Sequence, residues 1–141
     1  MNVRRMTSGD ADEVAALCEQ LGELASPPQI AHRLGLIAER RDQAAFVAED
    51  DERIVGWVHV YGHVPLAEEA FAEIGGLVVE RRERGQGAGR LLVETAEAWA
   101  RDAGYDELRV APQTARESAH EFFEQLGYAR TATTVQFARP L

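Results

Sequence analysis

Hydrophobic and polar positions repeat with two different periods along the chain, and these periods separate strands from helices. Apolar runs that are continuous, or that alternate with polar residues, predict seven strands at residues 2–6, 44–49, 53–64, 70–79, 106–111, 128–130 and 133–137. Spacings of three and four residues predict four helices. Two of them follow the cap signals at residues 8–10 and 26–28, and the other two span residues 88–103 and 116–126.

The order of these elements predicts a single α/β domain over residues 1–141. A turn at residues 50–52 makes the two strands around it an antiparallel hairpin. The unit 70–111 crosses over through the helix at 88–103, and a crossover of this kind joins parallel strands. We therefore expect a mixed, mostly antiparallel sheet of about seven strands, with helices on both faces.

Composition and charge narrow the class of protein. Of the 141 residues, 45% are apolar and 28% are charged, as in soluble globular domains. The 24 acidic and 15 basic residues give a net charge of −9, which argues against nucleic-acid and anionic-membrane partners. This charge favours a cationic ligand, and an effect on solubility alone is the alternative. The first residues turn polar at once, and no apolar run approaches the ~18 residues of a membrane span. A cytoplasmic location is therefore expected.

Two residue counts limit the chemistry. Cys18 is the only cysteine, so neither an intrachain disulfide nor a cysteine-ligated metal site is expected. It belongs to the helical stripe Val14, Leu17, Cys18 and Leu21, which predicts a buried thiol. All 15 basic residues are arginines, so the chain carries no side-chain amine.

The most distinctive segment lies between the strand at 70–79 and the helix at 88–103. It contains three alternating glycines, in Arg84-Gly85-Gln86-Gly87-Ala88-Gly89-Arg90, and Arg81 and Arg82 precede it. Glycines let a ligand approach the backbone, and the first N–H groups of a helix have no partner inside the helix. These donors and the helix dipole favour an anion, so we interpret the segment as a phosphate-binding loop. A Walker loop is excluded because it requires a lysine.

The segment Arg84 to Gly89 after Leu77-Val78-Val79 resembles the acyl-CoA motif of the GNAT superfamily of N-acetyltransferases. A second stretch, residues 116–128, is similar to the late helix of that superfamily, which ends in a glycine and an aromatic residue. The order of elements agrees along nearly the whole chain. The resemblance implies the GNAT fold, with a splayed cleft between two strands that holds acetyl-CoA as co-substrate, and transfer of the acetyl group to an amine.

The resemblance also implies the residues of the cofactor site. Leu77, Val78 and Val79 would pair with the pantetheine arm as an additional strand, and the N–H groups from Gly85 to Arg90 would hold the pyrophosphate. The implied cofactor-binding set is Leu77, Val78, Val79, Arg84, Gly85, Gln86, Gly87, Ala88, Gly89, Arg90 and Phe123. Gly75 and Gly76 suit a bulge or a close approach of a ligand to the backbone, and close packing against a neighbouring helix is the alternative.

Catalytic and acceptor-binding candidates lie on two neighbouring strands. Glu73 is a carboxylate in an otherwise apolar strand, where some superfamily members place a general base; a strand-end ion pair is the alternative. Trp57, His59, Tyr61 and His63 alternate along one strand face. We expect Trp57, His59, Tyr61 and Glu73 to line the acceptor site, with Tyr61 as a candidate proton donor; a covered sheet face is the alternative.

Two positions depart from the superfamily pattern. Phe123 stands where many members carry a tyrosine that protonates the departing thiolate, and Arg116 stands where many carry asparagine. The missing hydroxyl keeps open a second hypothesis, a CoA-binding module that acts as a sensor with little turnover. A longer acyl chain or a non-amine acceptor is a third. The acceptor, a small-molecule amine or a peptide or protein amine, is left open. A homodimer is common among enzymes of this kind.

Overall fold

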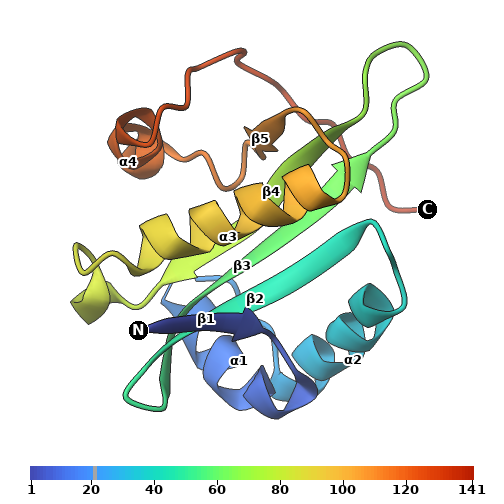
Figure 1. The fold of residues 1–141 in the computed structure, drawn as a ribbon. Coiled ribbons are helices and arrows are strands. Elements are labelled where there is room, and N and C mark those ends of the chain that lie inside the picture. The colour runs from blue at the N-terminus through green and yellow to red at the C-terminus, as the bar shows by residue number, and fades with distance from the viewer. Residues whose placement is uncertain (21) are drawn as a thin grey trace.

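Five strands form one mixed sheet in the order β1-β2-β3-β4-β5 (Figure 1). The computed structural model describes residues 1–20 and 22–141. The strands are β1 (Asn2–Arg5), β2 (Gln43–Asp50), β3 (Arg53–His63), β4 (Phe71–Val79) and β5 (Leu108–Val110). The pairs among β1, β2, β3 and β4 are antiparallel, whereas β5 is parallel to β4. The predicted mixed and mostly antiparallel sheet is confirmed.

Helices cover both faces of the sheet. They are α1 (Ala11–Glu19), α2 (Pro27–Ala38), α3 (Ala88–Asp102) and α4 (His120–Gln125), with 3-10 turns η1 (Ser8–Asp10), η2 (Arg81–Glu83) and η3 (Glu117–Ala119). One core lies between the sheet and α3, and a second lies under α1 (Figure 1). The crossover from β4 through α3 to β5 places the start of α3 beside the end of β4, which is the region that the glycine-rich segment occupies.

Local sequence signals explain where the elements begin and turn. The Ser26 side chain accepts a hydrogen bond from the Gln29 N–H, and the Gln29 side chain accepts one from the Ser26 N–H, which together form a capping box at α2. Asp51 and Glu52 adopt positive φ angles of 51° and 63° between β2 and β3. Two such residues give the turn that matches the twist of a hairpin.

Burial agrees with most of the predicted stripes. Leu92 and Ala96 of the predicted α3 stripe are almost fully buried, but Leu91 and Ala103, which the same spacing places inward, are exposed. Val93, which lies outside the predicted stripe, is also buried. Cys18 is buried against α1 neighbours as predicted, and burial raises the pKa of its thiol. Leu21, the last member of its predicted stripe, lies outside the described residues.

The last two predicted strands are not formed. No helix or strand follows α4 in the described chain, and Val135 and Phe137 are 79% and 92% exposed. The side chains of residues 129–136 are mostly Ala, Thr and Gln, which offer little apolar area to bury against their own sheet. The sheet therefore has five strands rather than seven, and residues 128–141 form no helix or strand after the turn that ends α4.

Candidate active site

The edge of β4 that faces β5 is open over its second half. The two strands are paired only between residues 72–74 and 108–110. Hydrogen bonds from the Ala72 N–H to the Glu107 oxygen and from the Ala111 N–H to the Ile74 oxygen, both 2.9 Å, flank this short ladder. β4 continues to Val79, so five of its residues extend past the last contact with β5. This gap in pairing lies where the splayed cleft is predicted.

A bulge at Gly75 decides which backbone groups face the cleft. Val60 pairs with Ile74 and His59 pairs with Gly76, so Gly75 is the extra residue of β4. Beyond the bulge, the Glu80 N–H donates to the Val55 oxygen at 2.7 Å. Because strand groups alternate, Val78 then bonds toward β3, and the N–H and C=O groups of Leu77 and Val79 point into the cleft. Two of the three residues predicted to pair with pantetheine thus present free backbone groups there.

Aromatic rings on β3 occupy the space that the two glycines leave. A Cβ atom on Gly75 would lie 2.3 Å from Cε2 of Tyr61, and one on Gly76 would lie 2.7 Å from the Trp57 ring. No real Cβ contact is that short. The structure shows the predicted bulge, whereas the close packing is against two rings of β3 and not against a neighbouring helix as the alternative expected.

Replacing Gly75 by alanine is therefore expected to lower the free energy of unfolding by about 1–3 kcal/mol, because the Tyr61 ring must move. Gly35 is a matched control: it lies in α2 with no atom near its Cβ position, so Gly35→Ala should raise that free energy by about 0.5–1 kcal/mol. Urea unfolding of the two variants measures both. Equal changes in the free energy of unfolding for the two variants would mean that the position of the Tyr61 ring does not require a glycine at residue 75.

The glycine-rich loop gives α3 an open N-terminus. Gly87 caps the helix with φ of 91°, and Gly85 has φ of 86°. A Cβ atom at either position would meet nothing within 4 Å, so a ligand can reach the backbone here. No side chain caps the helix, and its first internal hydrogen bond runs from the Leu91 N–H to the Gly87 oxygen. The N–H groups of Ala88, Gly89 and Arg90 precede that bond and have no partner inside the helix.

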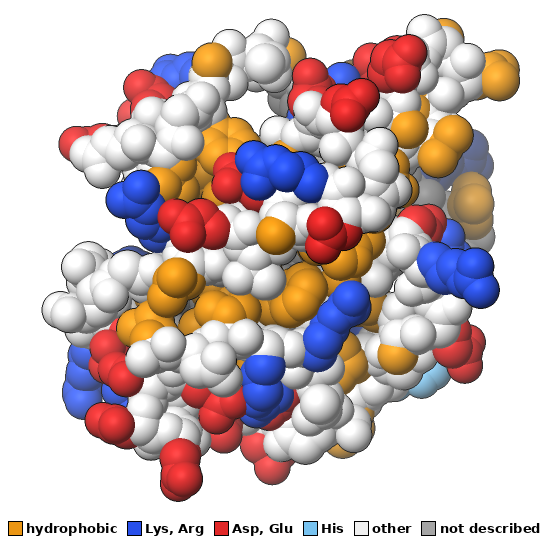
Figure 2. Space-filling model, in the orientation of Figure 1, with side chains coloured by type: hydrophobic (Ala, Val, Ile, Leu, Met, Phe, Trp, Pro, Cys, Tyr) orange, Lys and Arg blue, Asp and Glu red, His pale blue; other side chains and the backbone are white. Residues whose placement is uncertain are grey.

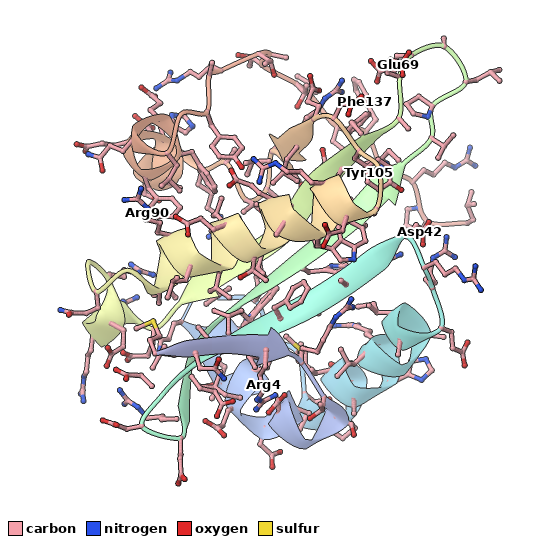
Figure 3. The ribbon with its side chains drawn as sticks, in the orientation of Figure 1. Arg4, Asp42, Glu69, Arg90, Tyr105 and Phe137 are labelled. Carbon is pink, nitrogen blue, oxygen red and sulfur yellow. The ribbon has the colours of Figure 1, made fainter. Side chains whose placement is uncertain are left out.

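Arginines surround this N-terminus. Arg81, Arg82, Arg84 and Arg90 are all exposed. Arg90 lies in the first turn of α3 (Figure 3) and pairs with Glu94 one turn later. Within residues 1–20 and 22–141, no ion pair involves Arg82 or Arg84. The helix dipole and these cations make the loop suitable for an anionic ligand, despite the acidic chain.

Gly89 differs from the other two loop glycines. A Cβ atom at Gly89 would lie 3.0 Å from the Phe122 ring and 3.5 Å from a Val79 methyl group. Gly89 therefore lets α4 and β4 pack closely against the first turn of α3. Phe123 is buried in the core on the α3 side of the sheet, with edge-to-face contacts to Phe122 and Tyr128. Its position as a cofactor contact remains a prediction.

Glu73 shares one carboxylate oxygen with two neighbours on β3. The Tyr61 hydroxyl donates to its Oε1 at 3.2 Å, and Nε2 of His63 lies 3.1 Å from the same atom. Burial and the Glu73 charge raise the pKa of Tyr61 to about 12, so its hydroxyl stays protonated. The Glu73 side chain is 18% exposed and that of His63 is 41% exposed. Glu73 is thus held just before the bulge, with a route to solvent through His63.

The remaining acceptor candidates separate into two environments. His59 lies beside Tyr61 and bonds through Nε2 to Oε1 of Gln43, and burial lowers its pKa, so the ring is neutral at neutral pH. Trp57 packs against the α1 core instead. Its indole N–H is buried and has no hydrogen-bond partner in the described chain. Trp57 as an acceptor contact therefore stays a prediction, and the structure adds His63 as a direct partner of Glu73.

One ion pair that the sequence analysis did not identify joins two loops distant in sequence. Arg116, between β5 and α4, bonds to Glu23, between α1 and α2, at 3.0 Å. Arg116 also donates to the Gln113 oxygen, which fixes its loop. The separation of 93 residues leaves no local pattern that could reveal such a pair. Arg116, noted as a departure from the superfamily pattern, thus connects the β5 side of the molecule to the α1 side.

Comparison with known proteins defines the class. The family model described as acetyltransferase (GNAT) family matches residues 14–128, and the chain belongs to that family. A mycothiol acetyltransferase from Rhodococcus jostii (strain RHA1) is 31% identical over 113 residues, which are 73% of this chain and 37% of that protein. N-acetyltransferase 8B from Homo sapiens is 33% identical over 90 residues, 61% of this chain and 38% of that protein. The chain thus spans under two fifths of the length of these relatives.

A solved structure agrees over almost the whole chain. The aminoglycoside N-acetyltransferase AAC(6')-Iy in complex with CoA has a TM-score of 0.86 to this structure, with 16% identity. The match covers 99% of this chain and 95% of that one. At this identity the similarity shows the fold, and the predicted GNAT fold is confirmed. No helix in the described residues is both long and apolar enough to cross a membrane.

Proposed function

We propose that this chain is an acetyl-CoA-dependent N-acetyltransferase that acts on a primary amine. The observation that carries the proposal is the bulge at Gly75, which turns the backbone of Leu77 and Val79 into an open cleft while Glu73 stands two residues before it. Family membership and the fold shared with a CoA-bound acetyltransferase support the same conclusion.

The residues that fit acetyl-CoA lie at the end of β4 and at the start of α3, which are neighbours in the fold. Gly85 and Gly87 leave the space that a Cβ would fill, next to the free N–H groups of α3, and these groups would hold the pyrophosphate. Arg84 and Arg90 would add positive charge, with the Gln86 and Ala88 backbone beside them. Leu77 and Val79 would bind the pantetheine arm as an additional strand. Acetyl-CoA supplies a thioester whose thiol is a good leaving group.

Glu73 acts as the general base in this proposal. The amine nitrogen forms a bond to the thioester carbonyl carbon, the carbon–sulfur bond breaks, and its electron pair leaves on sulfur. Glu73, directly or through one water, accepts the proton that the nitrogen loses, and His63 on the same oxygen passes it toward solvent. A thiol like that of cysteine has a pKa near ~8.5, so the thiolate leaves without an acid. Tyr61, whose pKa is raised to about 12, keeps its proton and is not needed as the donor.

The proposed acceptor is a small-molecule amine. Two of the proteins compared above carry a small molecule in their names, mycothiol in one and an aminoglycoside in the other. The net charge of −9 favours a cationic amine over an anionic one. His59 and Tyr61 form the wall of the proposed acceptor site next to Glu73.

Release of free thiol from acetyl-CoA, measured with a panel of small amines, tests the proposed function. We expect release that depends on the amine, together with a product whose mass has increased by one acetyl group. The chain has no lysine, so acetylation of its own side chains does not add to the signal. CoA binding without thiol release for any amine would instead support the CoA-binding sensor, and absence of CoA binding would contradict both.

A further inference from the structure

Four side chains form a continuous row beside Glu73. His63 of β3 stacks on Phe71 of β4, with ring centroids 4.9 Å apart and 28° between the ring planes, and Tyr61 meets His63 edge-to-face at 5.0 Å. The guanidinium carbon of Arg109 of β5 lies 3.6 Å from the centroid of the Phe71 ring. Because β4 lies between β3 and β5 in the sheet (Figure 1), the Phe71 ring stands between His63 and Arg109.

Phe71 is covered by polar side chains rather than by a hydrophobic core. It is 8% exposed, yet among residues 1–20 and 22–141 it belongs to neither of the two cores. Its neighbour Ala72 packs in the core under α3, so the side chain of Phe71 points to the opposite face of the sheet. An aromatic ring can stack on another ring and hold a guanidinium on its π face. Phe71 makes both of these contacts.

Arg109 is the cross-strand neighbour of Glu73, but the two side chains do not form an ion pair. Their Cα atoms are partners in the parallel pairing of β4 with β5, and neighbouring strands lie about 4.8 Å apart. Basic and acidic side chains lie side by side elsewhere on the surface, as Figure 2 shows. Within the described residues, the side-chain partners of the Glu73 carboxylate are instead Tyr61 and His63. The arginine next to the proposed base is thus held away from it.

Two carboxylates and the Phe71 ring hold the Arg109 guanidinium. Its Nη1 and Nη2 atoms donate to the two carboxylate oxygens of Glu68, both at 3.4 Å, and its Nε donates to Glu107. A planar guanidinium can rest its face on a ring while its edge binds carboxylates. Glu107→Gln keeps an oxygen for Nε and leaves Glu68 in place, so that change alone should not release Arg109.

We propose that Phe71 is a positioning residue for the proton transfer: its ring holds His63 against Glu73 and keeps the Arg109 cation away from Glu73. The inference rests on the proposed role of Glu73 as general base. His63 has no other side-chain hydrogen bond in the described chain and is 41% exposed, so stacking on Phe71 restricts its ring. A guanidinium on Glu73 would stabilise the charged form of the carboxylate and make it a weaker base.

The variant Phe71→Leu tests the proposal, since leucine is apolar but lacks the flat ring. We expect kcat to fall about tenfold, which is part of the 10²- to 10⁴-fold that a general base contributes, while KM for acetyl-CoA is unchanged. The rise of kcat/KM with pH, measured with one amine, should move to lower pH because Arg109 can then pair with Glu73.

A second substitution shows whether the Arg109 charge causes this shift. In the double variant Phe71→Leu/Arg109→Gln, the rise of kcat/KM should return to its wild-type pH, because glutamine carries no charge. Tyr61 and His63, the other titratable groups that face Glu73 in the described chain, are the same in all of these forms. A shift that persists in the double variant would overturn the proposal.

Phe46→Leu is the matched control. Phe46 is also a buried strand phenylalanine with an arginine over its ring, Arg5 at 4.9 Å, but it lies on β2. This variant should keep the wild-type pH profile. Arg109→Lys is a second test that leaves the Phe71 ring in place: lysine keeps the charge but cannot stack flat or bind Glu68 in two places, so the same shift is expected. An unchanged profile in both Phe71→Leu and Arg109→Lys, or a shift in Phe46→Leu, would overturn the proposal.

A crystal structure of Phe71→Leu reads the same contact without measuring activity. We expect an ion pair between Arg109 and Glu73 in this variant. A guanidinium that stays on Glu68 and Glu107 would overturn the proposal. Absence of acetyl transfer by the wild type would contradict the proposed function, whereas the structure of the variant would still show where Arg109 binds, so the two failures are distinguishable.

Discussion

Replacing Glu73 by glutamine is expected to lower kcat/KM for a good amine acceptor by about 10²- to 10⁴-fold, the contribution of a positioned general base. Glutamine keeps the size of the side chain, and its oxygen can still accept the hydrogen bond from the Tyr61 hydroxyl. It cannot accept a proton from the attacking amine. The loss should therefore appear in turnover, while calorimetry shows CoA affinity unchanged.

The pH profile and a control variant separate a base from a structural carboxylate. In the wild type, kcat/KM should rise with pH to a plateau, and Glu73→Gln should lower the plateau. Glu107 is a matched control because its carboxylate also accepts a side-chain hydrogen bond, from Arg109, but it lies outside the Tyr61 and His63 cluster. Glu107→Gln should keep full activity. Full activity in Glu73→Gln would assign that residue to structure or to substrate contact alone.

Replacing Gly87 by aspartate is expected to weaken CoA binding at least tenfold, or by ~1.4 kcal/mol. The new carboxylate would stand at the open cap of α3, where the pyrophosphate is proposed to bind, and would repel it. Aspartate tolerates positive φ better than most residues, so the fold should persist. Titration calorimetry with CoA measures the change, and circular dichroism checks the fold.

The other end of α3 provides a control of the same chemistry. Gly104 follows the helix with φ of 92°, close to the 91° of Gly87, and a Cβ atom there would also meet nothing within 4 Å. Gly104→Asp adds the same charge with the same backbone strain, far from the loop, and should leave CoA affinity unchanged. Equal weakening in both variants would mean that the effect comes from net charge or strain, and no weakening in Gly87→Asp would contradict the pyrophosphate site.

Sequence patterns predicted the elements whose residues bury a regular stripe. α3 and β2 are clear in the sequence because most of their buried positions belong to one helical face or one continuous apolar run. The prediction of the last two strands was wrong. Residues 128–137 alternate as a strand does, but a strand forms only where a partner edge is available. That partner is a property of tertiary or quaternary structure, which local periodicity does not contain.

The site shows the same division between local and long-range information. The glycine-rich segment could be identified from sequence because its glycines and arginines lie within ten residues. The two contacts of Glu73 Oε1 could not be identified from sequence, since they depend on the strand register that places Tyr61 opposite Glu73. Phe123 is packed between Phe122 and Tyr128, so packing alone accounts for an aromatic ring without a hydroxyl at this position.

A crystal structure with a bisubstrate analogue, in which an amine is joined to CoA through an acetyl linker, tests the central claim most directly. The account predicts the pyrophosphate at the N–H groups that open α3 and the pantetheine arm along Leu77 and Val79. It also predicts the amine nitrogen within hydrogen-bonding distance of the Glu73 carboxylate, directly or through one water. An analogue bound away from the open edge of β4, or with its amine directed away from Glu73, would contradict the account.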